Sequence, residues 1–170
     1  MGVGDGNRSK VFILNDYKRL KSNNMNESYS VGIINDNIYT WEVVLIGPKE
    51  TLYENGLYRA EMIFPLDYPE APPTFRFITP MWHPNIDRDG NVCISILHKS
   101  GEDEFGYELL SERWLPVRSP ESIILSILAL LDEPNCESPA NQDASQQFRE
   151  NPKEFQKKVR RLAQKSLESL

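Results

Sequence analysis

The chain has 170 residues and a formal net charge of −6. Its length fits one domain that buries most of the surface exposed by the unfolded chain. The negative charge argues against a nucleic-acid partner, and no apolar run reaches the ~20 residues of a membrane span. The first residues lack the apolar stretch of a secretory signal, so we expect a cytoplasmic or nuclear protein.

The first half of the chain predicts one helix followed by short strands. Residues 1–9 are Gly-rich and polar and are expected to be a flexible leader. Ser9 is a suitable cap for a helix over residues 10–21, where apolar side chains recur at helical spacing. A stiff, extended loop is expected over residues 64–73, which contain four prolines. Alternating β-branched and aromatic residues predict four strands, at positions 29–34, 40–46, 58–64 and 74–78.

The second half predicts three helices, because Ser119-Pro120, Ser138-Pro139 and Asn151-Pro152 each offer a cap followed by a proline. The first of these helices is apolar on nearly all sides and is expected to be buried. Strands followed by helices indicate an α+β fold: a four-stranded antiparallel meander sheet with an N-terminal helix, a buried central helix and two C-terminal helices. The last helix carries six cations on an outer face that we expect to be solvated, namely Lys153, Lys157, Lys158, Arg160, Arg161 and Lys165.

The main chemical signal is the tripeptide His83-Pro84-Asn85, followed eight residues after Asn85 by Cys93. Between them, Asp89-Gly90-Asn91 can reverse the chain, so we expect Asn85 and Cys93 to face one another. A thiol can carry an acyl group, and an amide can donate a hydrogen bond to the oxyanion that forms during its transfer. The spacing therefore indicates acyl transfer.

The cysteines allow two other interpretations. Cys93 taken alone is compatible with a small buried apolar side chain. A zinc site built from Cys93, Cys136, His83 and His98 would match no known finger or ribbon spacing, so no metal is expected.

Several segments along the chain form a pattern, namely Tyr68-Pro69 with Pro72-Pro73, His83-Pro84-Asn85, Asn91 to Leu97, Trp114-Leu115-Pro116 and Pro134-Asn135. Together they resemble the ubiquitin-conjugating enzymes, over residues 10–169. Within that family the chain is most similar to the Ubc7-like class, which has an insertion after the cysteine, here the acidic residues 98–113. The resemblance implies the ubiquitin-conjugating enzyme fold, with a catalytic core over residues 10–170.

The resemblance implies that Cys93 accepts ubiquitin from the activating enzyme as a thioester. Ubiquitin then passes, usually with a RING-type or other ligase, to a lysine of a substrate or of ubiquitin. Asn85 would stabilise the oxyanion or support its loop, and His83 would support the turn. Ser138 occupies the gate position of the family and either contributes to catalysis or only caps a helix. No bound cofactor is expected, because the activating enzyme consumes the ATP.

Docking of the activating enzyme and the ligase in this family uses the first helix and two loops. Glu70 departs from many relatives, which place a bulky apolar residue there, so a specialised ligase is expected. The acidic insertion is either a solvated loop or a surface that steers the incoming amine, and in the family it accompanies polyubiquitin chain building. The residues concerned are Lys10, Lys18, Arg19, Lys21, Pro69, Glu70, Pro116 and Val117 for docking, and Glu102, Asp103, Glu104 and Glu108 for the acidic loop.

The sequence leaves three further functions open. The chain could carry a ubiquitin-like modifier other than ubiquitin, form a non-catalytic binding module with this fold, or act as a cysteine hydrolase that uses His98. The favoured interpretation is a monomeric transferase without a membrane span. Its products would serve protein ubiquitination and proteasomal degradation.

Overall fold

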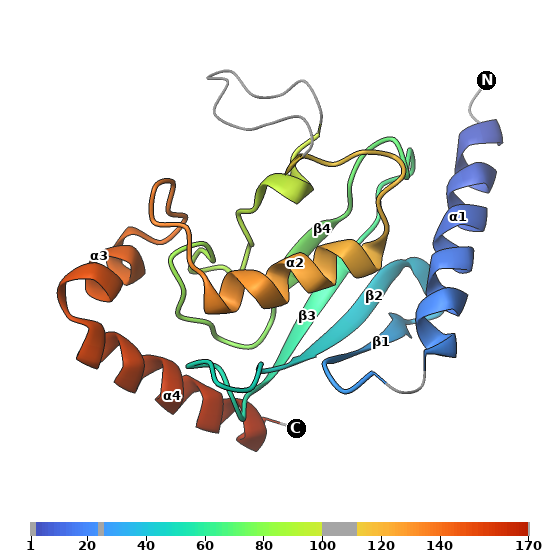
Figure 1. The fold of residues 1–170 in the computed structure, drawn as a ribbon. Coiled ribbons are helices and arrows are strands. Elements are labelled where there is room, and N and C mark those ends of the chain that lie inside the picture. The colour runs from blue at the N-terminus through green and yellow to red at the C-terminus, as the bar shows by residue number, and fades with distance from the viewer. Residues whose placement is uncertain (1–2, 24–25, 100–111, 170) are drawn as a thin grey trace.

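The computed structural model describes residues 3–23, 26–99 and 112–169. Four strands form one sheet in the order β1-β2-β3-β4, and every neighbouring pair is antiparallel. The α+β meander predicted from the sequence is thereby confirmed (Figure 1). The elements are α1 (Val3–Ser22), β1 (Tyr29–Ile34), β2 (Asn37–Ile46), β3 (Leu57–Ile63), β4 (Thr74–Phe77), the 3₁₀-helix η1 (Ser95–Leu97), α2 (Pro120–Asp132), α3 (Gln142–Glu150) and α4 (Pro152–Glu168).

One face of the sheet is apolar and the other is charged. The register places Val31, Val43, Ala60 and Phe77 in one row across the four strands, and all four are buried. Side chains of the neighbouring row point to the opposite face, where Glu42 pairs with Arg59 of β3 and Glu61 pairs with Arg76 of β4. This alternation is typical of an antiparallel sheet that packs one face on a core.

The helices cover the apolar face and the two ends of the sheet. The central helix α2 crosses the sheet, α1 stands beside β1 and β2, and α4 packs near β3 (Figure 1). Ile123, Ile124 and Ile127 of α2 are fully buried in the same core as the sheet. The expectation that α2 is buried on nearly all sides is wrong, because Leu125 is 51% exposed. Within the described residues, no helix is both long and apolar enough to span a bilayer.

Helix α1 begins at Val3 rather than at the predicted Lys10. Residues 3–9, expected as a leader, are therefore helical. Ser9 does not cap the helix, since it is buried within it, and its hydroxyl donates to the carbonyl oxygen of Gly6 at 3.1 Å. The same hydroxyl lies 2.6 Å from the hydroxyl of Tyr39 in β2. A tertiary contact thus holds the first turns of α1 against the sheet.

The start of α3 also differs from the prediction. Its cap is Asn141, whose side-chain oxygen accepts the amide proton of Ala144 at 3.0 Å, and the helix proper begins at Gln142. The predicted cap, Ser138, lies in the preceding bend and is exposed. The backbone amides of Ala140 and Asn141 both donate to the carbonyl oxygen of Pro84, which holds this segment outside the helix.

The contact between Tyr39 and α1 predicts a measurable cost for removing one hydroxyl. In Tyr39→Phe, Gly6 and Ser9 each lose a hydrogen-bond partner. The free energy of unfolding should fall by about 1 kcal/mol in urea denaturation at pH 7. Tyr17→Phe is the matched control, because the ring of Tyr17 also packs between α1 and the sheet while its hydroxyl makes no hydrogen bond in the described part of the chain. Equal effects of the two substitutions would contradict the assignment.

Candidate active site

After β4 the chain forms a narrow loop that brings Asn85 and Cys93 together. The amide of Cys93 donates to the carbonyl oxygen of Asn85 at 2.8 Å, and Ile86 pairs with Val92 in the next step of the ladder. The backbones of Asn85 and Cys93 are therefore neighbours, as the turn predicted.

The tip of this loop is held by one carboxylate and one glycine. A side-chain oxygen of Asp87 accepts the backbone amides of Asp89 and Asn91, both at 2.9 Å. Gly90 has φ of 94°, and a Cβ there would lie 2.0 Å from the carbonyl oxygen of Phe77. Only glycine fits this position, because other side chains would meet both backbone strain and a steric clash.

Cys93 stands between this loop and the short helix η1. It is a thiol and is partly exposed. Ile96, one turn along in η1, is buried and anchors the segment in the core. Cys93 is thus carried by a fixed backbone at a partly exposed position.

The carboxamide of Asn85 pairs with the backbone of Asn135, in the segment that follows α2. Its nitrogen donates to the carbonyl oxygen of Asn135 at 2.7 Å, and its oxygen accepts the amide of Asn135 at 2.8 Å. Asn85 is only 2% exposed. In this arrangement the side chain supports a loop, which is the second of the two roles that the sequence suggested.

His83 is fully buried, and both of its ring nitrogens are engaged by the fold. Nδ1 accepts the amide of Asn85 at 3.0 Å, so the ring proton lies on Nε2 and is donated to the carbonyl oxygen of Leu130 at 2.7 Å. Burial lowers the pKa of His83 to about 4. The ring is therefore neutral at physiological pH, and it cannot act as a base for Cys93 without breaking its bonds.

Together the residues 83–85 hold the chain between α2 and α3 at three points. His83 bonds to Leu130 at the end of α2, Asn85 to Asn135, and the carbonyl oxygen of Pro84 accepts the amides at the start of α3. These contacts comprise five hydrogen bonds, and all five use backbone atoms of the second segment, so the buried side chains of His83 and Asn85 are satisfied. The tripeptide thus sets the shape of residues 130–141 relative to Cys93.

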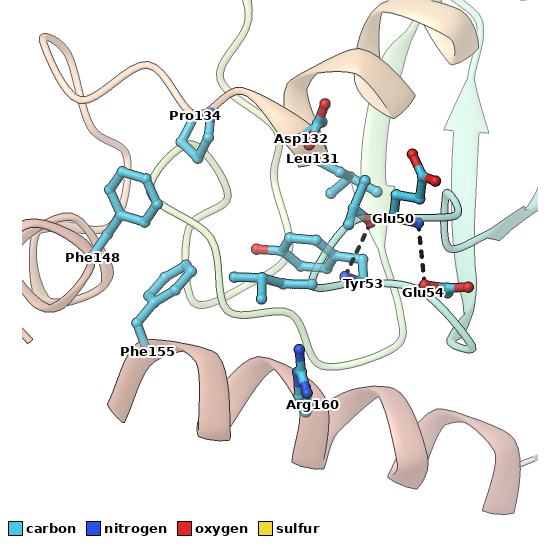
Figure 2. A pocket seen from close by; sticks show the side chains of 11 residues that line it. Glu50, Tyr53, Glu54, Leu131, Asp132, Pro134, Phe148, Phe155 and Arg160 are labelled. Atoms are coloured by element: carbon cyan, nitrogen blue, oxygen red, sulfur yellow. Dashed lines mark hydrogen bonds between the residues drawn. The ribbon is translucent and has the colours of Figure 1, made fainter. Parts of the chain in front are cut away.

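Figure 2 shows a cavity of about 310 Å³ against the same segment, between the β2–β3 connection and the helices α2, α3 and α4. Tyr53 forms one wall and donates its hydroxyl proton to the carbonyl oxygen of Trp82 at 2.7 Å, so it packs behind the residue that precedes His83. The described lining residues include no cysteine or histidine. The apolar part of the lining includes Leu131, Pro134, Phe148 and Phe155.

The predicted docking residues lie mostly on the surface. Lys10, Lys18, Arg19 and Lys21 are exposed on α1, and Pro116 and Val117 are exposed before α2. Pro69 is the exception: it is buried, and its carbonyl oxygen accepts the indole proton of Trp114 at 2.8 Å. Ser138 is exposed, away from the cap position taken by Asn141.

The side chain of Glu70 is exposed and pairs with Arg8 of α1 at 3.5 Å, a cation that sequence reasoning did not connect with it. The acidic-loop residues Glu102, Asp103, Glu104 and Glu108 lie outside the described residues. Within the described part of the chain, no group of three or more His, Cys, Asp or Glu side chains is placed to hold a metal ion.

The sequence did not reveal the hydrogen-bond partners of the tripeptide, because all of them are backbone atoms of residues far along the chain. It also missed Trp82, whose indole nitrogen donates to the side-chain oxygen of Gln147 at 2.8 Å. The Pro134-Asn135 motif was a signal for one of these contacts, although it did not reveal the atoms involved.

Comparison with known proteins gives the family. The family model described as "Ubiquitin-conjugating enzyme" matches residues 12–163, which include the tripeptide and Cys93. This chain belongs to the ubiquitin-conjugating enzyme family. It is 53% identical to "Ubiquitin-conjugating enzyme E2 15" of Schizosaccharomyces pombe over 156 residues, which cover 90% of this chain and 93% of the relative.

Two further relatives cover most of the chain, and the name of the first supports the Ubc7-like class. "Probable ubiquitin-conjugating enzyme E2 7" of Caenorhabditis elegans is 54% identical over 84% of this chain and 87% of its own length. "Ubiquitin-conjugating enzyme E2 G2" of Homo sapiens is 47% identical over 91% of this chain and 94% of its own length. As a ubiquitin-conjugating enzyme the chain is a transferase that receives ubiquitin from an activating enzyme through a thioester and works with ligases.

The Asn85–Asn135 pair predicts a large effect on stability for Asn85→Ala. Two part-buried hydrogen bonds are lost, so the free energy of unfolding should fall by about 1–3 kcal/mol in urea denaturation. Asn91→Ala, in the same loop but with an exposed side chain, should change it by less than about 0.5 kcal/mol. If Asn85→Ala is no more costly than this control, the pair does not support the loop.

The buried imidazole predicts a pH dependence. Because the folded pKa of His83 lies below the ordinary value of 6.5, the unfolded chain binds this proton more tightly. The stability that neutral His83 provides is present above pH 6.5 and is lost as pH falls towards 4, by about 3 kcal/mol in all.

NMR titration of the imidazole protons, with His98→Gln to assign the signals, should show His83 still neutral at pH 5. A midpoint between pH 6 and 7 would contradict the structural account of the ring.

Proposed function

We propose that Cys93 is the thioester nucleophile of this ubiquitin-conjugating enzyme. Its thiolate attacks the ubiquitin thioester carbonyl carbon on the activating enzyme, whose own thiol leaves. A lysine amine then attacks the new thioester, an amide bond forms, the Cys93 thiolate departs and the amine releases a proton. The observation that carries this proposal is the partly exposed Cys93 on a backbone bonded to Asn85.

The surroundings of Cys93 support transfer without a bound cofactor. ATP would be consumed earlier, by the activating enzyme. Thiol–thioester exchange between groups of similar pKa needs only a modest thiolate fraction. The reaction therefore does not require a charged His83 to stabilise the thiolate. We assign His83 and Asn85 to positioning, with Asn85 holding the segment that ends at α3. One N–H of the Asn85 carboxamide is donated to Asn135, and its second N–H is the donor that could serve the oxyanion.

Ser138 is proposed to act at the mouth of the site rather than as a helix cap. The cap is taken by Asn141, and the Ser138 hydroxyl is exposed in the bend between Asn135 and α3. A hydroxyl there can accept a hydrogen bond from an incoming ammonium or amine, although it cannot carry a charge. Its contribution to lysine activation is therefore expected to be small.

Docking of the activating enzyme and the ligase is proposed on α1, the Pro-rich loop and the loop before α2. These three segments are joined by two hydrogen bonds, from the Tyr68 hydroxyl to Asp16 at 2.8 Å and from Trp114 to Pro69. Val117 is 89% exposed and offers an apolar contact. The pairing of Glu70 with Arg8 reduces the cost of covering that carboxylate with an apolar ligase surface.

We further propose that the enzyme builds polyubiquitin chains for proteasomal degradation, as a monomer in the cytoplasm or nucleus. Support for chain building comes from the acidic composition of residues 98–113. The two ends of this insertion are held together, since the amide of Trp114 donates to the carbonyl oxygen of His98 at 3.0 Å. The insertion therefore begins and ends close to the short helix that follows Cys93.

A gel assay tests the central assignment. After incubation with activating enzyme, ATP and ubiquitin, the wild type and Cys136→Ser should both give an adduct that a reducing agent cleaves. Cys93→Ser should give only a more stable oxyester that resists the reducing agent. Cys136 is the matched control because it is the other thiol of the chain and is also partly exposed. A reducible adduct that persists in Cys93→Ser would overturn the proposal.

A further inference from the structure

Four cations form a cluster between the C-terminal helices and the loop that carries Cys93. Lys158 of α4 lies over the ring of Trp82, with its ammonium nitrogen 3.3 Å from the ring centre. Beside it, a hollow of about 300 Å³ is lined by charged side chains of α4 and by Gln147, the hydrogen-bond partner of Trp82. We call this group the basic cluster; it consists of Arg88, Lys157, Lys158 and Arg161.

Positive charge is in excess in the basic cluster. Two carboxylates partner it: Asp143 pairs with Arg88, and Glu154 pairs with Lys157 at 3.4 Å. The pKa of Lys158 is lowered, first by partial burial and then by the nearby charges of Arg161 and Arg88, with Asp143 opposing them. Lys158 is therefore repelled by Arg161 and Arg88, and an added anion would relieve this repulsion. The chain as a whole has a net charge of −6, so positive charge is concentrated here against the general balance.

The basic cluster is attached to the active site at two points. Trp82 directly precedes His83, and Arg88 lies in the turn between Asn85 and Cys93. Arg88 is three residues along the chain from Asn85, so their backbones lie within about 10 Å of each other. The ion pair between Arg88 and Asp143 also ties this turn to the start of α3. A polypeptide that brings a lysine to Cys93 can therefore reach the cluster with residues only a few positions away.

We propose that the basic cluster binds acidic side chains that flank the acceptor lysine, and so selects acidic protein acceptors. This inference rests on the proposed role of Cys93 as the carrier of ubiquitin. Charge complementarity identifies an acidic acceptor as the binding partner, because a carboxylate can bridge the cations of α4. The rest of the enzyme carries net negative charge and repels the same acceptor. Lys158, held over Trp82, presents a preformed part of the site.

A single-turnover assay tests the inference. The enzyme is charged with ubiquitin, activation is stopped, and the thioester is then chased with two lysine peptides that differ only in carrying Glu or Gln near the lysine. We expect the Glu peptide to discharge the thioester about three- to tenfold faster at low salt, and this advantage to shrink at about 0.3 M salt. Equal rates for the two peptides would overturn the inference.

The double variant Lys157→Glu/Arg161→Glu should lose the preference while charging of Cys93 and discharge to free lysine stay unchanged. The matched control is Lys153→Glu/Lys165→Glu, which makes the same change of charge on exposed positions of the same helix. Loss of the preference for the Glu peptide in both double variants would indicate a general effect of charge. It would contradict the assignment of a specific binding site to the basic cluster.

Two further outcomes show which proposal is wrong: the one on the basic cluster or the one on Cys93. They also test whether the basic cluster binds nucleic acid instead. If wild type never forms the thioester, the proposed function fails first, and this is seen before any peptide is added. If a labelled single-stranded oligonucleotide binds wild type but not Lys157→Glu/Arg161→Glu, and no peptide preference exists, the cluster belongs to a nucleic-acid site and the inference is wrong.

Discussion

The arrangement around Cys93 depends on the pairing of one side-chain amide with one peptide group. The carboxamide of Asn85 presents a donor and an acceptor to the backbone of Asn135, as a neighbouring strand would. An aspartate would place a second acceptor against the carbonyl oxygen, and an alanine would leave both groups without this partner. Because both partner atoms belong to the backbone, the pairing requires a particular residue at position 85 but not at position 135.

The polar side chains of His83 and Asn85 are satisfied by the fold and carry no charge. His83 is buried and neutral, and its two nitrogens and the carboxamide of Asn85 all bond to backbone atoms. Buried polar groups without such partners would cost stability. In the proposed function, Cys93 is therefore placed by backbone geometry, and the neutral His83 is not its ion-pair partner. This suits a reaction in which both the incoming and the departing groups can be thiols.

Much of this structure could be predicted from the sequence, and the errors share one cause. The strands follow from alternating side chains, and the approach of Asn85 to Cys93 follows from the turn at Gly90, because both signals are local. The starts of α1 and α3 differ from the prediction because distant partners decide them: the hydroxyl of Tyr39 contacts Ser9, and the carbonyl oxygen of Pro84 takes two amides before α3. For the same reason the backbone partners of the tripeptide and the position of Lys158 over Trp82 could not be read from local patterns.

The loop between Asn85 and Cys93 has a consequence for how this protein can vary. Its length is determined on both sides, by the pairing of Ile86 with Val92 and by the close approach of Gly90 to the carbonyl oxygen of Phe77. Adding or removing one residue would shift the pairing by one step, and successive side chains of an extended segment point to opposite faces. The sulfur would then turn from the surface towards the core. Substitutions are tolerable at the exposed positions of this loop, whereas changes in its length would inactivate the enzyme even if the rest of the fold were intact.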